Sequence, residues 1–337
     1  MNTTANPANP TRKPKILVAR AIFPEALAKL EESFEVCSNQ ADQVFTPQEL
    51  QKELSQVEGA LVTGSERIDA QALSQADQLK IVANISVGYN NFDIPAITAA
   101  GVMATNTPDV LTDTTADFGF ALLMAAARRI TESEHWVRAG KWDQWSIVNN
   151  PLGMDLNGST LGIIGMGRIG KGIARRALGC GMNVIYHNRS RLPADEEKAY
   201  SATYVSKEGL LRTADHVILV LPYTAENHHT IGATELGLMK PTAILVNIAR
   251  GGIVDDAALA QALQNGTIFA AGLDVFEGEP KVHPELLKCS NIVLAPHIAS
   301  ATEKTRRAMV DLAIKNLTTA LAGNKPPSLI NVEAFKG

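Results

Sequence analysis

The sequence predicts an α/β protein in which short buried strands alternate with helices. Two observations predict this class. Apolar runs of four or five residues recur along the chain with helical stretches between them, and a Gly-x-Gly-x-x-Gly segment directly follows one of these runs at Gly165. Such alternation is typical of parallel sheets with helices on their faces. The length of 337 residues suggests two domains rather than one.

The first series of strand and helix candidates begins at Lys15. Strands are predicted at residues 16–19, 59–62 and 79–83, and helical segments at 47–54 and 70–73 separate the apolar runs. A further helix is predicted to begin at Pro24, because proline suits the first helical position and apolar residues follow at helical spacing.

A second series begins near residue 161. Its predicted strands are residues 161–164, 183–186, 216–220, 244–247, 269–273 and 292–294. Between the two series, residues 113–138 are predicted to form one long helix with an apolar face, and residues 302–321 form a helix after the last strand. The pattern leaves open whether the first series is an independent domain or whether the chain returns to it.

The glycine segment lies between a predicted strand and a predicted helix. Gly165 permits a tight turn, Gly167 lets the backbone approach a pyrophosphate, and Gly170 allows the helix to pack closely on the strand. The helix N-terminus, with Arg168 and Ile169, then presents unpaired N–H groups to phosphates. This context favours dinucleotide binding over a plain glycine-rich turn.

Composition excludes several other classes of function. The net charge of −4 gives no electrostatic footprint for nucleic acid or an anionic membrane. Cys37, Cys180 and Cys289 are widely separated and fit neither a disulfide framework nor a zinc spacing, which favours a reduced, cytoplasmic setting. Residues 1–14 are rich in Asn, Thr and Pro, so we expect a disordered tail there, with no signal peptide or membrane span.

Three ionisable residues follow strands of the second series: Arg250, Glu279 and His297. Ligands of open α/β sheets bind outside the carboxyl ends of the strands, so these side chains are expected to converge. Arginine can grip a carboxylate through two parallel hydrogen bonds, histidine can donate a proton near neutral pH, and a nearby glutamate favours the imidazolium. Taken singly, each residue can be explained without a function, as a solvated loop residue, a turn residue or part of the core. Because all three follow strands of the same series, a shared ligand-binding site is favoured.

Other candidate chemistry is weaker. His228 and His229 lie in a polar loop after Pro222, and no carboxylate or cysteine spacing accompanies them, so no metal site is expected. The chain also lacks the Gly-x-Ser-x-Gly segment of serine hydrolases.

Five segments in order resemble the D-isomer-specific 2-hydroxyacid dehydrogenase family, from about Lys15 to Leu321. They are residues 86–93, 165–170, 247–252, 272–280 and 296–300. Within the family, the similarity is closest to glyoxylate/hydroxypyruvate reductases, and bacterial 2-ketogluconate reductases are near neighbours.

The resemblance implies a two-domain fold in which a Rossmann NAD(P)-binding domain is inserted in a flavodoxin-like substrate domain. Residues 1–109 and 300–337 would form the discontinuous substrate domain, and residues 110–299 the cofactor domain. The active site would lie in the cleft between them, with hinges near residues 106–108 and 299–301.

The resemblance also implies roles for individual residues. His297 is similar to the general acid that protonates the carbonyl oxygen, and Glu279 to its hydrogen-bonding partner. Arg250 resembles the substrate anchor, and the backbone N–H groups of Val87 and Gly88 resemble the receptors of the substrate carboxylate. A glutamine in place of Glu279 would have indicated a formate dehydrogenase.

Further residues are assigned to substrate and cofactor in the same way. Ser300 is expected beside the substrate and Asp274 beside the nicotinamide. Three more cofactor contacts are expected at the ends of neighbouring strands: Val220, Pro222 and Ile248.

Residues 140–145 are unusually aromatic for a chain with 5% aromatic residues. The two tryptophans there can simply pack on their own subunit. Related reductases pair through this region, however, and the resemblance implies that Trp145 reaches the active site of the partner. A homodimer is therefore expected.

Cofactor choice can be argued from the end of the second Rossmann strand. NAD-preferring domains place an acid there, which would repel a 2′-phosphate. This chain instead carries Asn188, Arg189 and Ser190, followed by Arg191, and these side chains can bind the phosphate. We therefore predict that NADP(H) is preferred and that NAD(H) can also be used, although a polar loop that merely carries arginines is the simpler alternative.

The expected function is reduction of glyoxylate or hydroxypyruvate to a D-2-hydroxy acid. Two alternatives stay open. One is a dehydrogenase for another 2-hydroxy acid, such as 2-ketogluconate, D-lactate or 3-phosphoglycerate. The other is a cofactor-sensing binding protein, because the family includes transcriptional co-repressors built on this scaffold.

Overall fold

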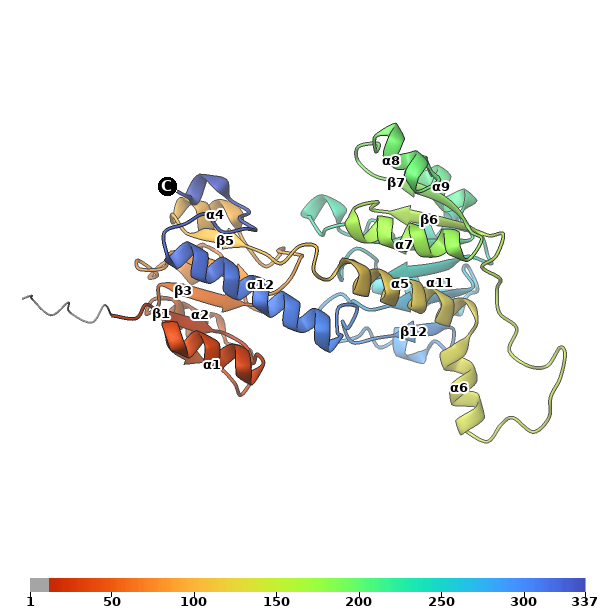
Figure 1. Ribbon diagram of the computed structural model, residues 1–337. Coiled ribbons are helices and arrows are strands. Elements are labelled where there is room, and N and C mark those ends of the chain that lie inside the picture. Colours follow the sequence, from red (N-terminus) through yellow and green to blue (C-terminus); the bar gives the residue numbers. More distant parts are fainter. Residues whose placement is uncertain (1–11, 337) are drawn as a thin grey trace, which may run out of the picture. The chain divides into compact units, whose positions relative to one another are not determined.

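The computed structural model describes residues 12–336, and its chain divides into two compact units (Figure 1). One unit comprises Met1–Leu111 and Glu303–Gly337, and the other comprises Thr112–Thr302. The chain thus begins one unit, forms the second and returns to the first. The predicted disordered tail lies largely outside the described residues. No helix within residues 12–336 is both long and apolar enough to cross a bilayer.

The first unit is a five-stranded parallel sheet with the strand order β2-β1-β3-β4-β5. This is the flavodoxin-like order. Its strands are β1 (Lys15–Val18), β2 (Glu35–Ser38), β3 (Gly59–Val62), β4 (Ile81–Asn84) and β5 (Met103–Thr105). Its helices are α1 (Pro24–Ser33), α2 (Pro47–Leu54), α3 (Ala70–Leu73), α4 (Ile94–Ala99) and α12 (Glu303–Leu321), with a 3₁₀ turn η3 (Val332–Ala334).

Both faces of this sheet are buried. Leu17 of β1 points into one apolar cluster with Leu54 of α2, whereas its neighbour Ile16 points into another with Leu317 of α12. Parallel sheets covered on both faces show such near-continuous apolar strands. The returning helix α12 thereby completes the unit that the N-terminal part of the chain begins.

The second unit is a seven-stranded parallel sheet with the order β12-β11-β10-β9-β6-β7-β8. Counted from β6, this is the dinucleotide-binding order with one further strand, β12. Its strands are β6 (Thr160–Ile164), β7 (Asn183–His187), β8 (Ala202–Tyr204), β9 (His216–Leu219), β10 (Ile244–Asn247), β11 (Ala270–Leu273) and β12 (Ile292–Leu294). Its helices are α5 (Thr112–Ala127), α6 (Ile130–Arg138), α7 (Arg168–Gly179), α8 (Ala194–Ala199), α9 (Lys207–Thr213), α10 (Ala233–Leu238) and α11 (Asp256–Gln264), with 3₁₀ turns η1 (Ala225–Asn227) and η2 (Leu286–Lys288).

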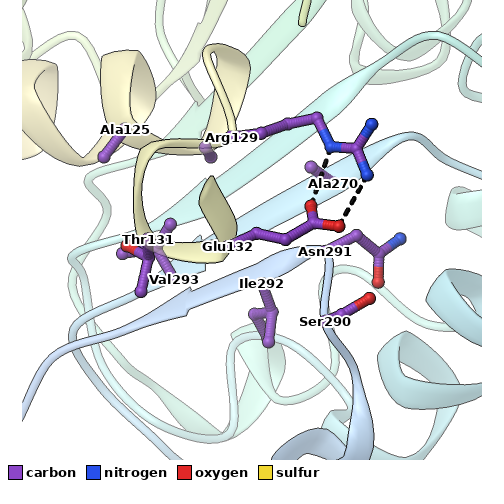
Figure 2. Close-up of a pocket in the computed structure, with 10 residues that line it drawn as sticks. Ala125, Arg129, Thr131, Glu132, Ala270, Ser290, Asn291, Ile292 and Val293 are labelled. Atoms are coloured by element: carbon purple, nitrogen blue, oxygen red, sulfur yellow. Dashed lines mark hydrogen bonds and ion pairs between the residues drawn. The ribbon is translucent and has the colours of Figure 1, made fainter. Parts of the chain in front are cut away.

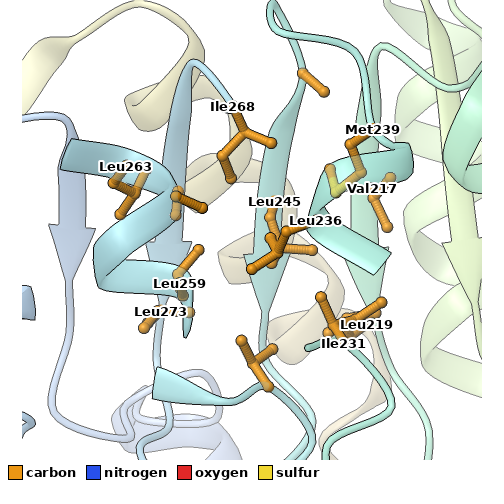
Figure 3. Close-up of a cluster of buried hydrophobic side chains, with 14 of the residues drawn as sticks. Val217, Leu219, Ile231, Leu236, Met239, Leu245, Leu259, Leu263, Ile268 and Leu273 are labelled. Carbon is orange, nitrogen blue, oxygen red and sulfur yellow. The ribbon is translucent and has the colours of Figure 1, made fainter. Parts of the chain in front are cut away.

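Two apolar layers fix the central strands of this sheet. On one face, Leu236 of α10 and Leu259 of α11 pack against Leu245 of β10 (Figure 3). On the other face, α5 and α7 approach so closely that a Cβ on Gly172 would lie 2.9 Å from the Cβ of Ala116. Each fully buried leucine stabilises the fold by about 1.5–3 kcal/mol. The carboxyl ends of the strands, where the candidate residues lie, are therefore rigidly placed.

The single helix predicted over residues 113–138 is wrong. The chain forms α5 and α6 instead, because Arg129 adopts a left-handed backbone with φ 52°. The Met154 amide donates a hydrogen bond to the carbonyl of Ala127 at 2.8 Å, which ends α5. The guanidinium of Arg129 then pairs with Glu132 through contacts of 2.7 and 2.6 Å at the start of α6 (Figure 2).

Candidate active site

The glycine loop after β6 has the geometry that its sequence predicts. Gly165 has φ +104°, and a Cβ there would lie 2.6 Å from the backbone of Val220. A Cβ on Gly170 would lie 2.5 Å from the carbonyl oxygen of Gly165, whereas one on Gly167 would meet nothing within 4 Å. Gly165 and Gly170 therefore serve the turn and the helix packing, and Gly167 borders open space.

This loop can hold a pyrophosphate. Gly167 is the N-cap of α7, and no side chain caps the helix. The first N–H groups of the helix have no acceptor within the helix and carry its positive dipole end. The Met166 amide donates instead to Asn188 Oδ1 at 2.7 Å, which ties the loop to the end of β7. The residues present thus fit the phosphates of a dinucleotide.

Of the two arginines in the segment after β7, Arg191 is bound by a carboxylate, and Arg189 lies close enough to Glu226 for their charges to interact. Arg191 forms two 2.8 Å hydrogen bonds with Glu197, and Tyr186 also donates to Glu197 at 2.7 Å. The Arg191 and Tyr186 hydrogen bonds lower the pKa of Glu197 to about 2. Arg189 and Ser190 are exposed, and within residues 12–336 neither side chain forms a hydrogen bond.

Arg250 follows β10 in a loop that a buried asparagine holds. Asn247 Oδ1 accepts from the Ala249 amide at 3.0 Å, and its Nδ2 donates to the Arg250 carbonyl at 3.0 Å. A Cβ on Gly251 would overlap the carbonyl of Phe276, so the Arg250 loop lies directly against the loop that carries Glu279. The sequence pattern did not reveal this role of Asn247.

Glu279 and His297 form a hydrogen-bonded pair. His297 Nδ1 lies 2.8 Å from Glu279 Oε2, and the Phe276 amide donates to Glu279 Oε1 at 2.9 Å. Both carboxylate oxygens are therefore engaged, and the histidine side chain is still 47% exposed. With Nδ1 held by the carboxylate, the Nε2 position of the imidazole is available to a ligand.

The buried carboxylate of Asp274 holds the backbone around His297. Asp274 Oδ1 accepts from the Ile298 amide at 2.8 Å, and Asp274 Oδ2 accepts from the Ala299 amide at 2.9 Å. His297 itself has φ 55°, a left-handed conformation that costs about 1–2 kcal/mol in a residue with a side chain. The surrounding hydrogen bonds impose this conformation and so aim the imidazole.

Burial and neighbouring charges have opposing effects on the pKa of Glu279 and on the pKa of Arg250. Burial alone would raise the pKa of Glu279, but its hydrogen bond to His297, the charge of His297, the Phe276 amide and the charge of Arg250 together lower it. Burial lowers the pKa of Arg250, and the charge of Glu279 opposes that effect. The charges of Arg250 and Glu279 thus interact within the second unit.

The first unit carries the predicted carboxylate receptors in the loop after β4. Asn106 Nδ2 donates to the Val87 carbonyl at 2.9 Å, and Asn84 Nδ2 donates to the Gly88 carbonyl at 3.1 Å. Within residues 12–336, the N–H groups of Val87 and Gly88 form no hydrogen bond. The loop is therefore held through its carbonyls, with two amides left to donate.

Of the remaining predicted residues, Val220 lies against the glycine loop, and the others occupy different segments. Val220 and Pro222 follow β9, and Ile248 is buried after β10. Ser300 lies shortly before α12, and Trp145 is 72% exposed in the segment after α6. A small pocket between α5, α6 and β12 contains none of the predicted site residues (Figure 2).

The sequence spacing around His228 and His229 did not show the carboxylate that lies beside them in the fold. Glu277 lies 48 residues from His229 in sequence, yet its Oε2 is 3.0 Å from His229 Nε2. Only the folding of the β9 and β11 loops toward each other creates this contact, so sequence spacing did not show it.

Comparisons with known proteins agree with this fold. Residues 120–299 match the family model of the D-isomer specific 2-hydroxyacid dehydrogenase NAD binding domain. A glyoxylate reductase of Thermococcus onnurineus is 47% identical over 326 residues, which are 96% of this chain and 97% of the relative. A glyoxylate reductase of Aeropyrum pernix is 46% identical over 330 residues, covering 96% and 98% of the two chains.

Solved structures give the same result. An NADPH-dependent glyoxylate/hydroxypyruvate reductase of Sinorhizobium meliloti, in complex with NADP and malonate, superposes with a TM-score of 0.84 at 36% identity, covering 96% of this chain and 98% of that one. A putative 2-hydroxyacid dehydrogenase of Polaromonas has a TM-score of 0.86 at 37% identity, covering 94% and 99%. The predicted fold, a Rossmann domain inserted in a flavodoxin-like domain, is confirmed. The chain is thus an oxidoreductase that belongs to the D-isomer-specific 2-hydroxyacid dehydrogenase family.

Proposed function

We propose that this protein is an NADPH-preferring reductase that converts glyoxylate and hydroxypyruvate to D-2-hydroxy acids. The observation that carries the proposal is the Glu279–His297 hydrogen bond, held against the Arg250 loop at the carboxyl edge of a dinucleotide-binding sheet. The relatives named glyoxylate reductase, at 45–47% identity, support this substrate class.

His297 is proposed to act as the general acid. Glu279 accepts a hydrogen bond from Nδ1, so the proton on Nε2 is the one delivered to the carbonyl oxygen of the oxo acid. When bound, the nicotinamide supplies the hydride that reaches the carbonyl carbon. The products are a hydroxyl group on the substrate and a neutral imidazole on the protein.

Arg250 is proposed to anchor the substrate. Its guanidinium stays protonated, as arginine does in proteins, and the nearby charge of Glu279 favours the charged form. A planar guanidinium can bind a carboxylate through two parallel hydrogen bonds. The unengaged amides of Val87 and Gly88 in the first unit are proposed as donors to a substrate carboxylate.

We propose that the segment after β7 makes the protein prefer NADPH over NADH. This segment carries no acid from Asn188 to Arg191, and Arg189 and Ser190 are exposed there without hydrogen-bond partners among the described residues. Arg191 contributes less than its sequence position suggests, because Glu197 already binds it. Asp274, Val220, Pro222 and Ile248 stay proposed contacts of the remaining part of the cofactor.

We propose that two copies of the chain pair through the exposed apolar side chains that run from the last turns of α5 to Leu152. Several large apolar side chains between Met124 and Leu152 are exposed, and isolated soluble chains rarely expose so many in one segment. Pairing of two copies through this segment would cover them.

The decisive experiment measures NADPH and NADH oxidation against a panel of 2-oxo acids, with His297→Asn beside the wild type. We expect turnover of glyoxylate and hydroxypyruvate, and a roughly 10²–10⁴-fold lower kcat in His297→Asn with NADPH binding retained. Arg250→Ala should mainly raise KM.

Three results would contradict the proposal. Absence of turnover with every oxo acid, despite NADPH binding, would indicate a cofactor-sensing protein. Higher kcat/KM for 2-ketogluconate or pyruvate than for glyoxylate would change the substrate. Equal or greater efficiency with NADH would reverse the cofactor preference.

A further inference from the structure

Two histidines and a glutamate meet beside the proposed active site without taking part in it. His228 and His229 lie in the loop after η1, and Glu277 follows β11. One possible ligand atom from each of the three side chains lies within 4.8 Å of the other two. We propose that His228, His229 and Glu277 bind a divalent transition-metal ion of the zinc type.

The distances suit a metal ion with short bonds. Glu277 Oε2 lies 3.0 Å from His229 Nε2, and Glu277 Oε1 lies 3.8 Å from His228 Nε2. Zinc bonds of about 2.0–2.2 Å in a tetrahedron place neighbouring ligand atoms roughly 3.4 Å apart. The two observed distances, one to each oxygen of the carboxylate, each differ from this value by about 0.4 Å. The Glu277 and His228 side chains are each 43% exposed, so small adjustments meet little resistance.

The second nitrogen of each imidazole also faces a partner. The hydroxyl of Tyr223 lies 3.2 Å from His228 Nδ1, and Asp255 Oδ2 lies 3.8 Å from His229 Nδ1. Both histidines therefore direct Nε2 toward Glu277. Metal-bound histidines commonly have a carboxylate, carbonyl or water on the other nitrogen, which fixes the ring and raises its basicity.

The backbone holds the pair in place. The His229 amide donates to the Gly252 carbonyl at 2.7 Å, and the two imidazole rings stack with centroids 3.8 Å apart. Gly252 has φ +78°, and a Cβ there would lie 3.2 Å from His228 Nδ1. Close packing against this glycine thus limits the position of the His228 ring, and the His229 ring stacks on it.

The donor set selects the class of ion. Imidazole nitrogens favour zinc, cobalt, nickel and copper, whereas magnesium and calcium prefer oxygen ligands. Three protein ligands leave one position of a tetrahedral ion for water. None of the three ligands belongs to the proposed catalytic group, so the inference goes beyond the proposed function and does not depend on it.

The test uses the full chain without a histidine tag. Titration with Co²⁺ is followed by its visible absorption, and Zn²⁺ affinity is measured by competition with a fluorescent chelator. We expect one ion per chain in the wild type, and loss of this binding in His229→Gln and in Glu277→Gln. Zn²⁺ should also raise the melting temperature of the wild type and of neither variant, because an ion that binds only the folded state stabilises it.

Two matched variants sharpen the result. Asp255→Asn removes the charge beside His229 Nδ1, and the asparagine oxygen can still cap α11 by accepting the hydrogen bond that the Ala258 amide donates to Asp255 Oδ1. Zn²⁺ affinity should fall roughly 10–100-fold in this variant. His135→Gln, on the exposed surface of α6, should bind as the wild type does.

Absence of saturable Zn²⁺ and Co²⁺ binding by the wild type would overturn the proposal. So would unchanged affinity in Glu277→Gln, whose exposed side chain can be replaced without disturbing the fold. Equal losses in His135→Gln and His229→Gln would show that binding is spread over surface histidines, which also overturns the site.

Discussion

Gly167 is the N-cap of α7 and Gly170 lies in its first turn, but a methyl group added at each would meet different surroundings. At Gly170 it would lie 2.5 Å from the Gly165 carbonyl, and at Gly167 it would meet nothing within 4 Å. We expect Gly170→Ala to lower the stability of folding by about 1–3 kcal/mol through overpacking. Gly167→Ala should leave stability unchanged and weaken NADPH binding.

Thermal melting and NADPH titration of both variants check this pair of outcomes. A melting temperature for Gly170→Ala equal to that of the wild type would show that the loop has more room than its geometry indicates. Full NADPH affinity in Gly167→Ala would mean that the open space beside Gly167 is not where the pyrophosphate lies.

Arg189 is the residue on which the cofactor preference depends most. Arg191 is already bound to Glu197, so Arg189 is the arginine available to a 2′-phosphate. Removal of one charge-assisted hydrogen-bonding group costs about 1.5–3 kcal/mol, which corresponds to roughly 10–100-fold in affinity. Arg189→Ala should raise KM for NADPH by that factor and leave KM for NADH nearly unchanged. An equal effect of Arg191→Ala would assign the phosphate to the other arginine.

The sequence predicted which residues lie at the strand ends, but not all of their contacts. The hydrogen bond between Glu279 and His297 is present, while their catalytic roles stay predictions. The supporting bonds of Asn247 and Asp274 were not predicted, because a buried polar side chain next to a strand looks the same in sequence whether or not it holds a loop. The contact of Glu277 with His229 was missed because it depends on tertiary structure alone.

At the scale of elements, a helix or strand was predicted correctly where its hydrophobic pattern was strong. The central strands were predicted from their apolar runs, whereas β2, β5 and β8 were missed, because they are only three or four residues long and mix polar with apolar side chains. The break between α5 and α6 was missed because no glycine or proline marks it. It depends on the left-handed Arg129 and on a distant amide that caps Ala127.

His216, the first residue of β9, makes the stability of the fold depend on pH. Burial lowers its pKa below the usual 6.5, and Lys240 adds to that effect, while the hydrogen bond to the Asp155 carbonyl and the charge of Asp215 oppose it. A depressed histidine pKa means that the unfolded chain binds the proton more readily. The stability present at neutral pH is therefore lost as pH falls below about 6.5.

We expect His216→Leu to weaken this dependence. The difference in melting temperature between about pH 7.5 and about pH 5.5 should be smaller in the variant than in the wild type. His135→Gln, which replaces an exposed histidine, should keep the wild-type difference. An unchanged difference in His216→Leu would show that other groups carry the acid sensitivity.

At the scale of the whole molecule, the order of the strands was not readable from hydrophobic periodicity. That pattern left open whether the chain returns to its first unit, and family resemblance resolved the question. The structure shows the physical reason for the return: α12 supplies Val310, Ala313 and Leu317 to one face of the first sheet. Without that helix, this face would expose Ile16, Val18 and Leu61.

The segment after α6 leads to the last prediction. Trp145, Ile147 and Val148 are 72%, 74% and 70% exposed, which is costly in water unless a second copy covers them. Light scattering should give twice the 36.0 kDa mass of one chain. The double change Ile147→Asp and Val148→Asp should yield monomers, because an apolar interface does not tolerate unpaired charges.

Val44→Asp is the matched control, because Val44 is similarly exposed at 60% but lies in the first unit, and it should stay dimeric. Trp145→Ala separates pairing from catalysis. If Trp145 completes the site of the partner, this variant keeps the dimer mass and raises KM for hydroxypyruvate. An unchanged KM in an intact dimer would restrict Trp145 to the interface, and a wild-type protein of one-chain mass would exclude the arrangement altogether.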